Sequence, residues 1–145
     1  MESIRSIAVS DGVEISSVRE AGHNGKSDTY WISQFAEDGG DAILSADTDF
    51  FKKPPQVEAV FKTGLKVIHL PKGWAIANRS LQAAHVFLWW ERIEKQLSEM
   101  RPRQCYSPPY NLNDTGKLKQ IPFGFQSAQK KIKRARKRGG KNTAD

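Results

Sequence analysis

Three aspartates are spaced so that their side chains could act on one ligand. Asp47 and Asp49 follow a short apolar run with only Thr48 between them. Asp28 lies upstream, between a polar loop and a segment whose apolar residues have helical spacing. Like charges this close repel unless water, a cation or a metal offsets them. Carboxylates without a fixed Lys or Arg partner suit Mg²⁺ or Mn²⁺, which prefer oxygen ligands. Such an ion can hold a phosphodiester, activate water and stabilise the leaving oxygen.

Each aspartate also has a purely structural interpretation. Asp47 could be a turn residue, and Asp49 could cap the next helix, because Asp side chains bond to nearby backbone groups. Asp28 could likewise cap the helix that it begins, a role that is compatible with binding a metal. The helices and strands that position these aspartates therefore have to be considered before one of the two interpretations is chosen.

Hydrophobic spacing and turn residues predict strands alternating with helices. Strands are expected over 13–18, 42–45 and 66–70, and helices over 28–37, 54–63 and 80–100. This alternation predicts a mainly parallel sheet covered by helices. In such a sheet the carboxyl ends of the strands and the starts of the following helices share one edge, where ligand sites form. Asp28, Asp47 and Asp49 are therefore expected to face one cleft.

The residues around these aspartates resemble those of PIN-like domains. The family pattern has an acid at a helix start followed by Trp-Ile, then an apolar strand that closes in (Thr/Ser)-x-Asp-x-Asp-Phe. The matching stretches are DTYWI at 28–32, AEDG at 36–39 and ILSADTDF at 43–50, with weaker likeness in KVIHLPKG at 66–73 and WWERI at 89–93.

The resemblance implies a three-layer α/β/α fold with a mainly parallel sheet over 1–100. PIN-like domains of the VapC toxin type are metal-dependent ribonucleases of toxin–antitoxin pairs. By this likeness, Asp28, Asp47 and Asp49 would ligate Mg²⁺ or Mn²⁺, Ser45 or Thr48 would support the cluster, and an antitoxin protein would be the partner. The family usually begins with a strand that ends in Asp. No such strand precedes residue 28, so an N-terminally incomplete domain is expected.

The C-terminal part has a different character. Residues 101–125 contain Pro and Gly in loop-like settings and predict an extended, docked segment, whereas 126–145 are nearly free of apolar residues and predict a disordered tail. A basic run in this tail would bind RNA phosphates or an acidic partner, unless it is only a solvated surface. The expected RNA-binding residues of this run are Lys130, Lys131, Lys133, Arg134, Arg136, Lys137 and Arg138.

Other residues carry weaker signals. Lys72, in the loop after the 66–70 strand, could contact an RNA strand by charge, and Trp74 could either stack on a base or pack in the core. His23, His69 and His85 share no metal-ligand spacing and are expected to be structural, with His23 the one closest to the cleft.

Composition limits the setting. The 145 residues suffice for one domain, and the formal net charge of +7 arises in the tail, because residues 1–113 carry 13 basic and 14 acidic side chains. Cys105 is the only cysteine, so no disulfide framework or cysteine zinc site is expected. The sequence has no apolar run long enough for a membrane span and no secretory signal, and a reducing cytoplasm is expected.

These observations predict a Mg²⁺-dependent endoribonuclease that acts as a toxin on RNA. The alternative is a catalytically impaired PIN-like remnant that binds RNA or an acidic partner protein through its basic tail. The sequence leaves a homodimer open.

Overall fold

The computed structural model describes residues 10–16, 25, 27–46, 52–111, 113–122 and 124–142. In chain order the elements are α2 (Asp28–Glu37), β1 (Ala42–Ser45), α3 (Pro54–Thr63), β2 (Lys66–His69), α4 (Lys72–Ala75), α5 (Arg79–Glu99), β3 (Cys105–Ser107), β4 (Lys119–Ile121) and α6 (Phe125–Asn142). The expected helix–strand alternation from residue 28 to residue 99 is present, so the predicted α/β fold is confirmed.

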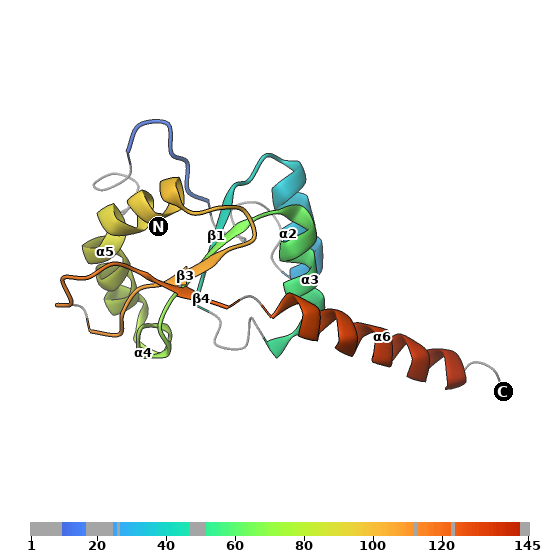
Figure 1. Ribbon diagram of the computed structural model, residues 1–145. Helices are drawn as coiled ribbons and strands as arrows, with labels where there is room; N and C mark the ends of the chain where they lie inside the picture. The colour runs from blue at the N-terminus through green and yellow to red at the C-terminus, as the bar shows by residue number, and fades with distance from the viewer. Residues whose placement is uncertain are drawn as a thin grey trace.

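The described strands form one mixed sheet in the order β1-β2-β3-β4 (Figure 1). β1, β2 and β3 are parallel, and β4 runs antiparallel to β3. The carboxyl ends of β1 and β2 are in register, since Ser45 lies opposite His69. Helices connect these parallel strands, and α3, which follows β1 in the chain, begins at the edge where β1 ends.

Helices pack against both faces of the sheet. α2 and α3 lie on one side and α5 lies on the other (Figure 1). Neighbouring residues of β2 point in opposite directions, so Val67 joins a cluster with Ile32 and Val60, while Ile68 joins a cluster with Trp89. The helices on both sides therefore contribute apolar side chains to the core.

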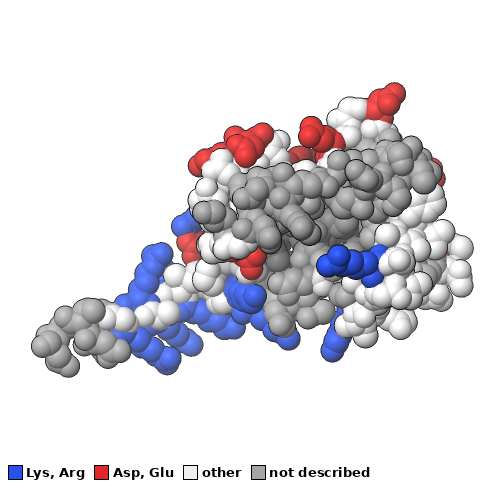
Figure 2. Space-filling view, turned by 180° about the vertical axis from the view of Figure 1, so that it is seen from behind, with Lys and Arg blue, Asp and Glu red and all other residues white. Residues whose placement is uncertain are grey.

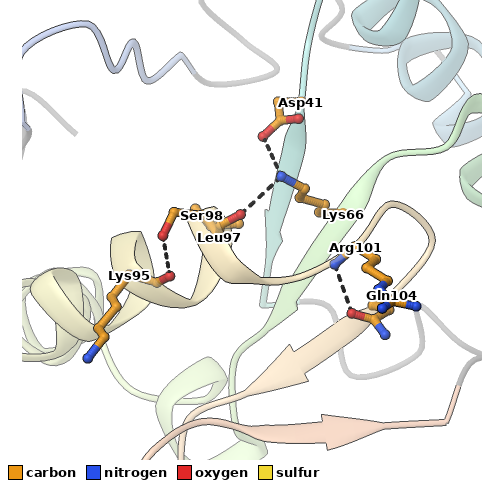
Figure 3. A network of polar contacts seen from close by, with 7 residues as sticks. All are labelled: Asp41, Lys66, Lys95, Leu97, Ser98, Arg101 and Gln104. Atoms are coloured by element: carbon orange, nitrogen blue, oxygen red, sulfur yellow. Dashed lines mark hydrogen bonds and ion pairs between the residues drawn. The ribbon is translucent and has the colours of Figure 1, made fainter.

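The amino-terminal edge of the sheet is tied together by polar contacts (Figure 3). The Nζ of Lys66, at the start of β2, lies 3.3 Å from Asp41 Oδ2 and donates to the carbonyl oxygen of Leu97 at 3.0 Å. Just beyond α5, the Arg101 backbone N–H donates to Gln104 Oε1 at 2.9 Å. This network joins α5 to the strands at the edge opposite the predicted aspartate site.

The strand expected over 13–18 is not present in its described part. Residues 13–16 have no regular structure. Just before them, the Ser10 backbone N–H and hydroxyl both donate to the carboxylate of Glu94 on α5, at 3.0 and 2.5 Å. Anchoring to a helix in this way replaces the strand partner that the alternating sequence pattern suggested. The rest of this predicted strand lies outside the described residues.

The segment after residue 100 is more structured than expected. The extended segment predicted over 101–125 supplies β3 and β4, so the sheet continues past the predicted domain boundary at residue 100. The tail predicted as disordered over 126–145 is helical through residue 142, as part of α6. The reason is an apolar stripe at helical spacing, in which Ala128 is buried and Phe125 and Ile132 are half-buried.

Within the part of the chain that the structure describes, no helix combines the length and the apolar character needed to cross a membrane.

Candidate functional site

The candidate site lies at the sheet edge where β1 and β2 end and where α2 and α3 begin. The Leu70 backbone N–H donates to the Ser45 carbonyl oxygen at 2.8 Å, which continues the pairing of the two strands to their last residues. Ser45 is buried, with 9% of its surface exposed. Asp47, Thr48 and Asp49, which follow, lie outside the described residues. The predicted convergence of the three aspartates therefore stays a prediction.

The helix start that carries Asp28 is capped by its neighbour. Ser27 is the N-cap of α2, with extended backbone angles, and its hydroxyl accepts a hydrogen bond from the Tyr30 backbone N–H at 3.3 Å. Asp28 is the first residue of the helix proper. Since Ser27 already performs the capping, the Asp28 carboxylate is available for other contacts.

Asp28 is held by two neutral hydrogen-bond donors. Trp31 Nε1, one helical turn further along α2, donates to Asp28 Oδ1 at 2.8 Å. Gln56 Nε2, from the first turn of α3, donates to Asp28 Oδ2. The two contacts fix the orientation of the half-buried carboxylate, and within the described residues no Lys or Arg forms an ion pair with it. This arrangement differs from a structural ion pair, in which Lys or Arg would neutralise the carboxylate.

Gln56 is a site residue that the sequence analysis missed. Its side chain is 5% exposed, although Gln is usually a surface residue. A usable signal was the helical spacing of α3, which places Gln56 one turn before Val60 on the buried face of the helix. The contact with Asp28, however, joins positions 28 apart in sequence and is decided by the packing of two helices.

The donor set around Asp28 suits a hard cation. Each carboxylate oxygen has two lone pairs and accepts one hydrogen bond from the described residues, so within this part of the chain one lone pair on each oxygen is left for a ligand. Metal-binding carboxylates are commonly held by such outer hydrogen bonds. The described residues by themselves contain no group of three or more His, Cys, Asp or Glu side chains that could hold a metal ion. A complete ligand set would thus need Asp47 and Asp49.

Two residues after β2 were candidates for RNA contact: Lys72 is exposed, whereas Trp74 is buried in the core. Lys72 begins α4, directly beyond Pro71, and its side chain is exposed near the candidate site edge. Trp74 is only 1% exposed, and its Nε1 donates to the Tyr110 carbonyl oxygen at 3.0 Å. Trp74 is therefore a core residue, and the base-stacking alternative for it is wrong.

The histidines that the structure describes are consistent with structural roles. His69 ends β2 opposite Ser45. The ring of His85 packs 5.2 Å from the ring of Trp74, centroid to centroid. His23 lies outside the described residues.

α6 presents its basic side chains to solvent. The helix packs on α3 through Phe125, Ala128 and Ile132, and its cations project from the remaining faces (Figure 2). In the same view, acidic side chains are seen mainly along the edge away from α6, and a few lie beside the cations near the base of the helix. Every cation of the basic run that was predicted to bind RNA is exposed on α6: Lys130, Lys131, Lys133, Arg134, Arg136, Lys137 and Arg138.

One α6 cation lines a groove that α6 shares with α2 and α3. Arg136 and Ile132 line this open groove of about 330 Å³ together with residues from Thr29 of α2 and from Pro55 to Thr63 of α3. Thr29 follows Asp28, and Pro55 precedes Gln56. The groove therefore extends along α3 and includes neighbours of the candidate site residues.

Comparison with known families gives a match to the N-terminal part of the chain. Residues 1–72 match a family model described as a PIN like domain. The matched range contains Asp28, Ser45, Asp47 and Asp49, and the match supports the predicted PIN-like domain. No curated protein and no solved structure matched the chain.

Proposed function

We propose that this protein is a metal-dependent endoribonuclease of PIN-like type, the toxin of a VapC-type toxin–antitoxin pair, which hydrolyses RNA phosphodiester bonds. The observation that carries the proposal is the Asp28 carboxylate, which Trp31 and Gln56 orient at the candidate site edge, with no ion-pair partner among the described residues. The match of residues 1–72 to the PIN like domain supports it. In this proposal the complete domain has the family's three-layer α/β/α arrangement.

The proposed metal ligands are Asp28, Asp47 and Asp49, with Ser45 and Thr48 supporting the cluster. These oxygen donors fit Mg²⁺ or Mn²⁺. When bound, the ion would supply an activated water and stabilise the leaving oxygen. The role of the protein is to hold the carboxylates oriented before the substrate arrives. Asp28 meets this requirement, because Trp31 and Gln56 each donate a hydrogen bond to one of its oxygens.

The proposed RNA contacts are Lys72 and the exposed cations of α6. Lys72 begins α4, three residues after the end of β2, and α6 lines a groove with residues of α2 and α3 that include Thr29 and Pro55. Cations in these positions would bind the phosphates on either side of the scissile bond, with an affinity that falls steeply as salt rises. We place the protein in the cytoplasm, held inactive by its antitoxin.

The test is cleavage of a structured RNA by the purified protein with Mn²⁺. Cleavage should stop with EDTA and in Asp28→Asn and Asp47→Asn. Asp38→Asn is the matched control, because Asp38 is exposed at the other end of α2. It should cleave at the wild-type rate. Cleavage that persists in EDTA or in Asp47→Asn would overturn the proposed mechanism.

A second candidate function is favoured by the regular helical structure of α6. A docked basic helix can hold RNA, or an acidic partner protein, without any cleavage. In this case the protein is a catalytically impaired PIN-like remnant. RNA binding that is equally tight with Mn²⁺ and with EDTA, and that produces no cleaved product, would favour this second function over the first.

A further inference from the structure

Gln56 is a buried polar residue whose burial needs a reason. Within the described part of the chain, Gln56 and Ser45 are the buried polar side chains, with Gln56 at 5% exposure. Burial of an amide is unfavourable unless its donors and acceptors find partners. Gln56 satisfies this only in part, because its Nε2 donates to Asp28 while its Oε1 is buried without a hydrogen-bond partner in the described structure.

The backbone holds Gln56 firmly in place. Pro54 and Pro55 open α3 with restricted backbone angles, and the Gln56 backbone N–H donates to the Lys53 carbonyl oxygen at 3.1 Å. On either side, Ile32 of α2 and Val60 of α3 are fully buried in one apolar cluster. The amide is thus aimed at Asp28 by two rigid helices.

The orphan oxygen lies next to the proposed metal ligand. Oε1 shares its carbon atom with the nitrogen that contacts Asp28, so it lies within a few ångströms of that carboxylate. An amide oxygen accepts hydrogen bonds from water, and Mg²⁺ and Mn²⁺ keep several of their waters when they bind carboxylates. Buried unsatisfied acceptors are rare in proteins, and one explanation for them is a functional group that binds there.

We propose that Gln56 is a positioning residue for the divalent cation, an inference that rests on the proposed nuclease function. Its Nε2 holds the Asp28 carboxylate in its ligating orientation. Its Oε1 accepts a hydrogen bond from a water of the hydrated cation. Gln56 does not touch the substrate. It acts through Asp28 and through that water.

The test is Mn²⁺ binding to the full chain by isothermal titration calorimetry, with no RNA present. Gln56→Met keeps the length and the buried packing of the side chain but loses both polar contacts. It should weaken Mn²⁺ binding about 10- to 100-fold, the range typical of outer-shell partners. Gln34→Met is the matched control. Gln34 Nε2 also donates to an Asp carboxylate on α2, that of Asp38 at 3.1 Å, but far from the site. It should bind Mn²⁺ as the wild type does.

Thermal unfolding of a second variant covers the case in which Gln56→Met does not fold. Gln56→Glu is isosteric and places a second carboxylate beside Asp28. Without Mn²⁺ the repulsion should lower the unfolding midpoint, and Mn²⁺ should raise it by more than in the wild type. The role of Gln56 would be overturned if the wild type and Gln56→Met bound Mn²⁺ with equal affinity. It would also be overturned if Mn²⁺ left the unfolding midpoint of Gln56→Glu unchanged. A wild-type protein that binds no Mn²⁺ would instead overturn the metal-dependent function itself.

Discussion

Phe61 of α3 and Phe125 of α6 stack face to face, with ring centroids 3.4 Å apart and ring planes 9° apart. The Arg103 guanidinium lies 4.9 Å from the centroid of the same Phe61 ring, and its Nε donates to the Phe61 carbonyl oxygen at 2.7 Å. These contacts anchor the first residue of α6 on α3. Because α3 also carries Gln56, the basic helix and the Asp28 contact are built on one helix.

Phe125→Ala should release the start of α6. Such a ring pair contributes about 0.5–1.5 kcal/mol beyond the apolar area that it buries. The variant should therefore be less stable to urea and should be cut faster by trypsin within 130–138. Phe87→Ala is the control, since Phe87 is 41% exposed on α5. If both variants are cut at the wild-type rate, the stack does not hold α6 in place.

Removing cations from the outer face of α6 should weaken RNA binding. In Lys130→Gln/Arg134→Gln/Lys137→Gln, the slope of log affinity against log salt should fall by about three, because each lost phosphate contact removes about one unit. Fluorescence anisotropy over a salt series measures this slope.

The control for that variant removes three cations elsewhere. Arg79, Lys95 and Arg101 are exposed and belong to α5 or follow it. Their replacement by Gln should change the slope much less. Equal losses in the two triple variants would show that net charge, and not the position of α6, determines RNA affinity.

Ser27→Ala should destabilise the protein by about 1 kcal/mol, within the range of about 0.5–2 kcal/mol known for lost N-caps. The Ser27 hydroxyl accepts from the Tyr30 backbone N–H, and no hydroxyl remains in Ala to do so. Urea unfolding measures the change. Ser33→Ala, at an exposed position of the same helix, should have little effect. A loss equal to that of Ser27→Ala would mean that the cap is not the cause.

Cys105 should be unreactive in the folded protein. Burial raises the pKa of its thiol to about 12, against a smaller opposing effect of a backbone hydrogen bond from His69. The thiolate is the reactive form, and it is nearly absent at pH 8. A thiol reagent such as DTNB should therefore react only after unfolding in guanidinium chloride. Fast reaction of the native protein at pH 8 would contradict this environment.

Glu94 should make stability depend on acid pH. Burial is the largest influence on its pKa and raises it. The hydrogen bonds from the Ser10 hydroxyl, the Ser10 backbone N–H and Trp90 Nε1 together outweigh burial, so the pKa lies below the ordinary 4.5. A lowered pKa means that this stabilisation is present above pH 4.5 and is lost as pH falls through the folded-state value.

Urea unfolding at pH values from 6 to 3 measures this dependence. Glu94→Gln should lose stability less steeply than the wild type below pH 4.5, because it has no carboxylate to protonate. Glu91→Gln, at an exposed position of the same helix, should keep the wild-type steepness. Parallel curves for all three proteins would exclude the Ser10–Glu94 contact as the source.

The sequence by itself determined the features that depend on near neighbours in the chain. The helices and strands from residue 28 to residue 99 follow from hydrophobic period and capping, except for α4 (Lys72–Ala75), which the sequence analysis predicted as a loop. Gly64 ends α3 with a positive φ of 77°, as its lack of a side chain allows. The placement of Asp28 at a helix start was predictable for the same reason. These signals are local, so one sequence suffices to detect them.

Only the tertiary structure decided the contacts between distant segments. Gln56 contacts Asp28 because α2 and α3 pack side by side. α6 is anchored on α3 because the Phe125 ring stacks on the ring of Phe61, a residue 64 positions earlier in the chain. β3 and β4 are three residues long and are strands because β3 pairs with β2 and β4 pairs with β3. The physical reason is the same in each case. The residue that stabilises each segment lies far away in the sequence, and the hydrophobic pattern of the segment itself does not indicate which residue that is.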